Sequence, residues 1–334
     1  MQERRSSTDL LAALLPGAAR WSAGCRARRP SPRRPPRPRP RRAGYRYSDL
    51  TQLRRQGELQ HLRRGAYARM RADDDVGRHR QLLQATVPQL GGGVVSHLSA
   101  AVLHGLPLPV GGLRHVQVTQ PAARSGRRRG HVHRFAAPLP AEDVTLLDGL
   151  AVTTLARTVV DLGRALPFAD AVAVADAALR QGLDGGELRL VLEQATGRPG
   201  VARARRVVAF ADGRSESAGE SRSRVLLHRI GLPPSTLQLV VLDEQGCFVG
   251  RSDFGWQEHR TLGEFDGRVT YGRLLRPGET AADVVHREKR REDALRDQGW
   301  EMVRWGSVDL HHEQALAERL RRAFRRGDAR APRG

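Results

Sequence analysis

The spacing of apolar residues along the chain predicts short helices and strands in alternation. Over 49–56 the pattern favours a helix, because Leu50 and Leu53 share one face and Gly57 follows as a stop signal. The next stretch, 59–70, alternates as two short strands of a hairpin. A helix followed by a basic hairpin is typical of the second half of a winged helix-turn-helix, although such short units also occur in many other folds.

Residues 76–212 mix the two periodicities and predict a mixed α/β region. Strands are expected at 113–121 and 130–136, and helices within 94–106, 153–162, 168–182, 186–195 and 200–211. A basic turn, Arg124–Arg129, would join the two strands. Arg157 and Asp161 are four residues apart on a predicted helix, as a structural ion pair would be.

The last third of the chain has a different order of elements. Helices are predicted at 216–230 and 280–298, and strands at 236–242, 247–254, 261–265 and 300–305. This gives a helix, three antiparallel strands, a crossover helix and a fourth strand. The remaining residues, 313–334, are expected to trail off as a basic tail.

The charge of the chain suggests a polyanionic partner. Lys+Arg 57 against Asp+Glu 36 gives a formal net charge of +21, and nucleic acid is the usual partner of such a surplus. Lys289 is the only lysine, so a coding bias toward arginine is the competing explanation. The two cysteines are too few for a disulfide scaffold or a four-ligand zinc site. Charges interrupt every apolar run, so we expect no membrane segment and a cytoplasmic protein.

Residues 1–43 are expected to be disordered. The segment 26–42 holds six prolines and many arginines, and such a composition cannot form a core. It is either a solvated tail, a basic arm that adds non-specific DNA affinity, or the product of a misplaced start codon.

The helix and hairpin near the N-terminus supply candidate DNA contacts. If they form half of a winged helix, the helix enters the major groove and the hairpin arginines meet phosphates. The side chains expected to do so are Thr51, Gln52, Arg54 and Arg55 on the helix and Arg63 and Arg64 on the hairpin.

Acidic residues at predicted strand ends form a second candidate site. Asp253 and Glu264 fall near the ends of consecutive strands, and Asp266 shares a face with Glu264 by alternation. Glu220, or its competitor Glu216, could reach the same edge from the preceding helix. Clustered carboxylates need a cation, and Mg²⁺ could activate a water against a phosphodiester. Alternatively, these acids are ordinary turn and surface residues.

The stretch 213–310 resembles a domain related to very-short-patch-repair endonucleases. The motifs that carry the resemblance are ESAGESRSRVLL, GRSDFGW, GEFDGRVTYG and EKRREDALRDQGWEMVRW. The resemblance implies a PD-(D/E)xK nuclease fold with Asp253 and Glu264 as metal ligands, Glu220 as the helix acid and Asp266 in an E-x-D-G feature. The catalytic lysine of that superfamily would stand at position 266. Lys289 on the crossover helix is the remaining lysine, so Lys289 is the candidate for its role.

Residues 44–212 resemble the AbiEi-like antitoxins of type IV toxin–antitoxin systems. RYSDLTQLRRQGELQHLRRGAYAR is similar to their N-terminal winged helix, and SHLSAAVLHGL and GLAVTTLARTVVDL are similar to the region that follows it. The resemblance implies a repressor that binds double-stranded DNA and a nucleotidyltransferase toxin as cognate partner. The family's first helices would precede Gly44, where this chain has the Pro/Arg tract.

Together these patterns predict an α+β protein. It would comprise a disordered tail (1–43), a winged-helix remnant (44–75), a mixed α/β region (76–212), a restriction-endonuclease-like α/β domain (213–312) and a basic tail (313–334). Three functions remain open. They are a DNA-binding regulator with a nuclease-like module, an active Mg²⁺-dependent endonuclease, and a protein-interaction module without DNA chemistry.

Overall fold

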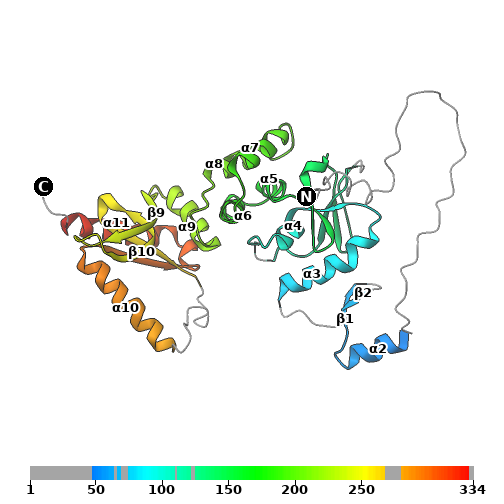
Figure 1. The fold of residues 1–334 in the computed structure, drawn as a ribbon, viewed down its shortest axis with the longest axis horizontal. Helices are drawn as coiled ribbons and strands as arrows, with labels where there is room; N and C mark the ends of the chain where they lie inside the picture. The colour runs from blue at the N-terminus through cyan, green and yellow to red at the C-terminus, as the bar shows by residue number, and fades with distance from the viewer. Residues whose placement is uncertain are drawn as a thin grey trace, which may run out of the picture. The chain divides into compact units, whose positions relative to one another are not determined.

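The computed structural model describes residues 47–63, 66–68, 74–109, 111–121, 125–267 and 280–330. These residues form two compact units (Figure 1). The first unit contains the described residues up to His104 together with those of Gly111–Thr154. The second contains the described residues of 105–110 and those from Leu155 onward. No helix in the described ranges is both long enough and apolar enough to span a membrane.

The first unit begins with a helix and a hairpin and continues as a six-stranded sheet with helices. Its helices are α2 (Tyr47–Arg55), α3 (Asp75–Thr86) and α4 (His97–Leu103). Its strands are β1 (Gln60–Arg63), β2 (Ala66–Ala68), β3 (Val94–Val95), β4 (Val116–Thr119), β5 (Arg127–Arg129), β6 (Val132–Phe135), β7 (Val144–Leu147) and β8 (Leu150–Thr153). Strands β1 and β2 pair antiparallel, so the predicted helix and hairpin are confirmed. The order of the larger sheet is β5-β6-β4-β3-β8-β7.

One expectation for this sheet is corrected. The predicted strands at 113–121 and 130–136 exist as β4 and β6, but they pair in parallel. Arg127–Arg129, the end of the segment expected as a connecting turn, instead form the edge strand β5, which pairs antiparallel with β6. Arg124 lies outside the described residues. A turn and a short edge strand are both polar, so the sequence pattern does not separate them.

The polar residues of SHLSAAVLHGL hold this unit together. Ser99 Oγ accepts a hydrogen bond from Gln117 N at 2.8 Å and lies 2.8 Å from His79 Nε2. His104 Nε2 lies 2.8 Å from the carbonyl oxygen of Thr153, which joins α4 to β8. Burial lowers the pKa of His79 to about 4, so this ring is neutral. The motif is therefore explained by buried cross-links between α3, α4 and the sheet.

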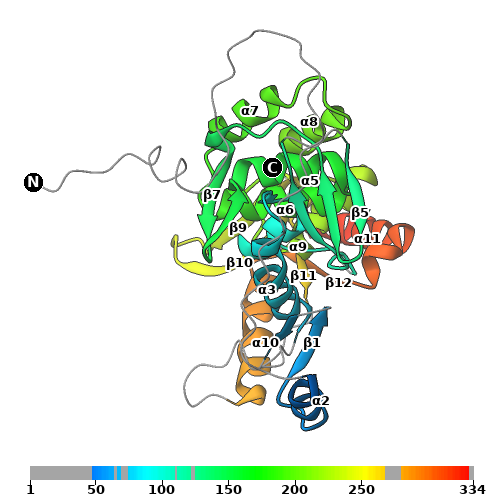
Figure 2. The same ribbon diagram turned by 90° about the vertical axis from the view of Figure 1, so that its right-hand side faces the viewer.

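The second unit joins a helical layer to a four-stranded sheet (Figures 1 and 2). Its helices are α5 (Leu155–Ala165), α6 (Phe168–Arg180), α7 (Gly185–Gln194), α8 (Val201–Phe210), α9 (Ala218–Arg229), α10 (Ala281–Asp297) and α11 (Glu313–Arg330). Its strands are β9 (Thr236–Leu242), β10 (Phe248–Trp256), β11 (Thr261–Asp266) and β12 (Glu301–Gly306). The predicted ion pair on α5 is confirmed: Arg157 Nε lies 2.9 Å from Asp161 Oδ2, and both side chains are buried.

The sheet has the order β12-β11-β10-β9. Strands β9, β10 and β11 are antiparallel neighbours, whereas β12 returns parallel to β11 after α10. This confirms the predicted order of helix, three antiparallel strands, crossover helix and strand. Apolar side chains of α9 and α11, such as Leu227 and Leu320, pack with Trp256 and Trp305. On α10, Leu295 packs with Leu262 in a separate cluster.

Two boundaries in the structure differ from the expected ones. Residues 313–330 form the helix α11 rather than a tail, because Leu316, Leu320 and Phe324 recur every four residues and are buried in the core. The expected boundary at 212/213 lies inside the second unit, and the division between units falls at Thr154/Leu155. The expected tail at 1–43 and the last residues, 331–334, lie outside the described residues.

Candidate functional site

Three of the predicted acids converge where α9, β10 and β11 approach one another. Glu220 stands in the first turn of α9, whose N-cap Ser217 accepts a hydrogen bond from Glu220 N at 3.1 Å. The Glu220 carboxylate accepts from Glu216 N at 2.7 Å and from Gln238 Nε2 at 3.0 Å. Burial raises the pKa of Glu220. The backbone N–H of Glu216 and the side-chain amide of Gln238 therefore hold the Glu220 carboxylate at the site. Glu216 contributes its backbone donor to this arrangement.

Asp253 lies between the other two acids. The register that pairs Phe254 with Gly263 continues to bring Asp253 opposite Glu264. Asp253 Oδ2 accepts a hydrogen bond from Phe265 N at 2.9 Å. Burial raises the pKa of Asp253 to about 7, and the charges of Glu220 and Glu264 add to the rise. Clustered carboxylates predict a raised pKa for Asp253, but desolvation by burial is the largest cause of the rise.

Gln238 belongs to this site and is absent from the sequence-based set. It lies on β9 with a φ of 54°, in the left-handed region, and its Nε2 donates to Glu220. Its Oε1 is buried and has no hydrogen-bond partner within the described residues. A glutamine inside the apolar run TLQLVVL was the one available signal.

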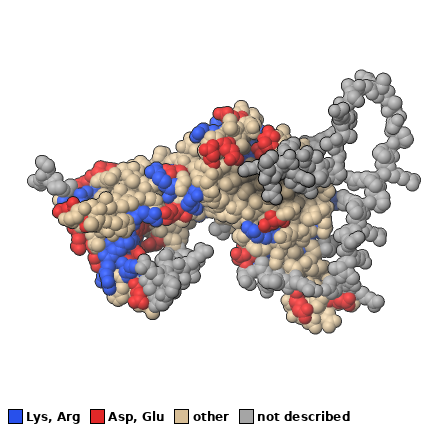
Figure 3. Space-filling model, viewed as in Figure 1, with Lys and Arg blue, Asp and Glu red and all other residues tan. Residues whose placement is uncertain are grey.

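Glu264 is ion-paired through both of its oxygens. Its Oε1 lies 2.6 Å from Arg291 Nη2 on α10, and its Oε2 lies 3.0 Å from Arg304 Nε on β12. Glu288 also pairs with Arg291 at 3.0 Å, and Glu292 with Arg304 at 3.4 Å. Figure 3 shows Lys and Arg side chains gathered over α10 and the sheet beside it.

Asp266 and Lys289 do not join the cluster. Asp266 is exposed at the end of β11, and Lys289 is exposed on α10 without a hydrogen bond or ion pair to the rest of the described chain. In those same residues, no group of three or more His, Cys, Asp or Glu is placed to hold a metal ion. Because both oxygens of Glu264 already face guanidinium groups, the residues present do not fit Mg²⁺.

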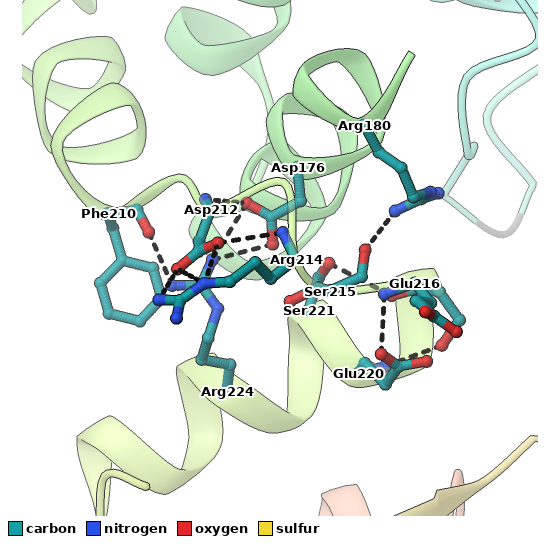
Figure 4. A network of polar contacts seen from close by, with 11 residues as sticks. Asp176, Arg180, Phe210, Asp212, Arg214, Ser215, Glu216, Glu220, Ser221 and Arg224 are labelled. Carbon is teal, nitrogen blue, oxygen red and sulfur yellow. Dashed lines mark hydrogen bonds and ion pairs between the residues drawn. The ribbon is translucent and has the colours of Figure 1, made fainter. Parts of the chain in front are cut away.

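A polar network connects the helical layer to this site (Figure 4). Arg224 on α9 donates to both oxygens of the fully buried Asp176 on α6, at 3.0 and 2.8 Å. Asp176 also accepts from Asp212 N at 2.7 Å. Farther along α6, Arg180 donates to the carbonyl oxygen of Ser215, the residue before Glu216. The segment before α9 is thus hydrogen-bonded to α6 at Asp212 and at Ser215.

The candidate DNA-contacting residues occupy α2 and the hairpin of the first unit. Gln52, Arg54 and Arg55 are exposed on α2, and Thr51 is half-buried. Arg64 lies outside the described residues.

Arg63 is placed differently from the expectation. Its guanidinium donates to Thr86 Oγ1 at 2.9 Å, to the carbonyl oxygen of Ala85 at 2.5 Å and to Gln89 Oε1 at 2.7 Å. Arg63 therefore holds β1 against the end of α3. The phosphate contact predicted for Arg63 from the sequence stays a prediction.

Substituting Arg63 tests this placement. We expect Arg63→Ala to lower the free energy of unfolding by roughly 1–3 kcal/mol, because the buried Thr86 hydroxyl and the part-buried carbonyl oxygen of Ala85 lose their donor. The salt dependence of DNA binding should remain that of the wild type, since no phosphate contact is lost. Thermal unfolding and a salt titration of DNA affinity measure the two effects. Unchanged stability together with a reduced salt slope would restore the phosphate role.

Strand β5 adds an exposed basic edge to the first unit. Arg127, Arg128 and Arg129 are all exposed, and none of them forms an ion pair with a described acid. Burial lowers the pKa of the neighbouring His133, and the Arg128 charge adds to this effect. The positive charge along this edge is thus uncompensated.

Comparison with known proteins gives two matches of the same extent. Two uncharacterized proteins of Mycobacterium tuberculosis, from strains CDC 1551 / Oshkosh and ATCC 25618 / H37Rv, are each 33% identical to this chain over 178 residues. The match covers 53% of this chain and 62% of each relative, so the chain spans less than two thirds of their length.

A family model assigns part of the middle region. The matched range runs from β3 through α8 and therefore crosses from the first compact unit into the second. It ends before α9 and the four-stranded sheet. Residues 94–210 match the family model of the AbiEi antitoxin C-terminal domain.

Proposed function

We propose that the protein is a DNA-binding regulator of the AbiEi antitoxin type. The observation that carries the proposal is the match of residues 94–210 to the AbiEi antitoxin C-terminal domain. The helix α2 and the hairpin β1–β2 precede this range, as the DNA-binding part of such an antitoxin would. Its partners would be double-stranded DNA and a cognate toxin protein.

The charges of the first unit support a duplex partner. Exposed Arg54 and Arg55 end α2, and the uncompensated arginines of β5 offer further contacts to phosphates. The aromatic content of 4% is low, which favours backbone contacts to a duplex over stacking on single strands. In this proposal α2 belongs to a winged helix whose earlier helices would precede residue 47.

A substitution on α2 tests the proposal. We expect Arg55→Ala to weaken binding to the preferred DNA sequence by about 1–3 kcal/mol and to bind other sequences almost as before, because a base contact is lost. Arg189→Ala removes the same charge from an exposed position on α7 and should leave binding unchanged. Gel shifts with a specific and a scrambled duplex measure both. If Arg55→Ala matches the wild type on every duplex, α2 is not the recognition helix.

The four-stranded sheet with α9 and α10 would then serve as a DNA-contacting or structural module with the PD-(D/E)xK order of elements. The alternative, a Mg²⁺-dependent endonuclease, has the convergence of Glu220, Asp253 and Glu264 in its favour. The ion pairs of Glu264 with Arg291 and Arg304 make the endonuclease the less favoured of the two functions. Supercoiled plasmid incubated with Mg²⁺ or Mn²⁺ should remain intact. If the wild type nicks the plasmid and Asp253→Asn abolishes the nicking, the endonuclease becomes the favoured function.

A further inference from the structure

We propose that Arg291 and Arg304 are the fixed counter-charge of the carboxylate cluster and replace a divalent cation there. This inference concerns the second unit alone, so it stands whether or not α2 binds DNA. It assigns a role to two arginines that the proposed function does not use.

The backbone register places Arg304 beside Glu264. Strands β11 and β12 run parallel, and Glu264 is the register partner of Arg304. Register partners in a sheet project to the same face, so the guanidinium reaches the carboxylate from the neighbouring strand. Arg304 Nε lies 3.0 Å from Glu264 Oε2.

Packing of α10 places Arg291 on the other oxygen. Leu295 is fully buried in a cluster with Leu262, which precedes Glu264 by two residues on β11. One helical turn and two strand residues cover nearly the same distance, about 5–7 Å. Arg291, one turn before Leu295, is therefore aligned with Glu264. Its Nη1 also donates to the carbonyl oxygen of Arg251 at 3.0 Å, which fixes the guanidinium on β10.

The two arginines already neutralise the negative charge that would attract a cation to Glu264. The Glu264 side chain is only 11% exposed, and each oxygen faces a positive group. A divalent ion would have to displace at least one guanidinium before it could reach an oxygen of Glu264. An arginine is always charged and does not dissociate from the chain, so it neutralises the acid under all conditions.

A second glutamate provides the matched comparison. Glu301 is also buried and also held by two arginines, Arg326 at 2.9 Å and Arg330 at 2.7 Å. Its partners lie on α11, and no second acid contributes to its surroundings in the interactions described. Glu264 differs because Asp253 lies beside it and Glu220 lies close to Asp253. Only at Glu264 would loss of an arginine leave carboxylates grouped for a cation.

Divalent-metal binding to the full-length protein tests the proposal. The wild type should bind no Mn²⁺ by electron paramagnetic resonance, and Mg²⁺, Mn²⁺ or Ca²⁺ at constant ionic strength should not shift its melting temperature. Arg291→Ala should be less stable than the wild type but should regain several degrees with each divalent ion, since a cation then replaces the guanidinium. Adding Glu264→Gln to Arg291→Ala should abolish that gain. Arg326→Ala should be destabilised and gain nothing from metal.

Two results would overturn the proposal. One is stoichiometric Mn²⁺ binding by the wild type that Glu264→Gln removes, because the site would then accept a cation with both arginines present. The other is an Arg291→Ala protein that metals stabilise no more than Arg326→Ala. If Arg291→Ala does not fold, Arg304→Ala serves in the same series, and the Mn²⁺ measurement on the wild type is decisive without any variant.

Discussion

Arg224→Met is expected to lower the free energy of unfolding by about 3–5 kcal/mol, because it leaves the Asp176 carboxylate buried without its ion pair. Asp176 is fully buried, and Arg224 binds both of its oxygens. Burial already raises the pKa of Asp176 despite the arginine, so the charged carboxylate depends on this partner. Arg224 also donates to the carbonyl oxygen of Phe210 at 2.7 Å and lies over its ring. Chemical denaturation of the full-length protein measures the loss.

A second ion pair between the same two helices is the control. Arg222 of α9 pairs with Asp170 of α6 at 2.9 Å, but its side chain is 32% exposed. Solvent screens this pair, so Arg222→Met should cost less than about 1 kcal/mol. The double variant Asp176→Leu/Arg224→Met should recover most of the stability lost in Arg224→Met, because no buried charge remains. Equal losses for Arg222→Met and Arg224→Met would show that burial is not the cause.

The Asp176–Arg224 pair also explains why the domain boundary could not be read from the sequence. Residues 211–217 contain aspartate, glycine and serine, a composition that predicts a linker. In the structure Asp212 N donates to Asp176, and Ser215 accepts from Arg180. A polar segment can be a linker or a hydrogen-bonded connection, and only the tertiary partners decide which.

Local patterns predicted most elements, because apolar periodicity survives in the tertiary structure. The strands from β9 to β12 and the helix α10 follow their predicted ranges closely. The α11 helix was missed because its many arginines dominate the composition, while Leu316, Leu320 and Phe324 carry the helical period. Strand β5 was missed because Arg127–Arg129 contains no apolar residue, so no hydrophobic pattern marks the segment that pairs with β6.

The sequence predicted most of the acidic residues of the candidate site but not the arginines that neutralise them. Of the four predicted acids, Glu220, Asp253 and Glu264 lie in one group, whereas Asp266, which strand alternation placed beside Glu264, is exposed. The two arginines that neutralise Glu264 come from α10 and β12, and their approach depends on parallel register and on the packing of Leu295. These are long-range features that spacing along the chain does not encode.

Asp253→Asn is expected to stabilise the metal-free protein at neutral and alkaline pH. The folded protein holds the Asp253 proton up to about pH 7, whereas the unfolded chain releases it near the usual value of 3.8. As pH rises through this window the unfolded state loses its proton first, so the wild type loses stability that the asparagine variant keeps. The difference should be near zero below pH 4 and should reach about 4 kcal/mol above pH 7 at most.

The local contacts favour the amide as well. Asparagine Oδ1 can still accept a hydrogen bond from Phe265 N. Repulsion from Glu220 and Glu264 disappears with the charge.

The free energy of unfolding is measured in EDTA between pH 4 and pH 8, with Asp297→Asn as the control for removing an exposed acid from α10. The other buried acids titrate in both proteins, so their contributions cancel when the free energy of unfolding of the wild type is subtracted from that of the variant. A substitution that stabilises a site so strongly would mean that the acid is retained for activity or recognition rather than folding. An asparagine variant less stable than the wild type at pH 8 would show instead that the Asp253 carboxylate is part of the structural framework.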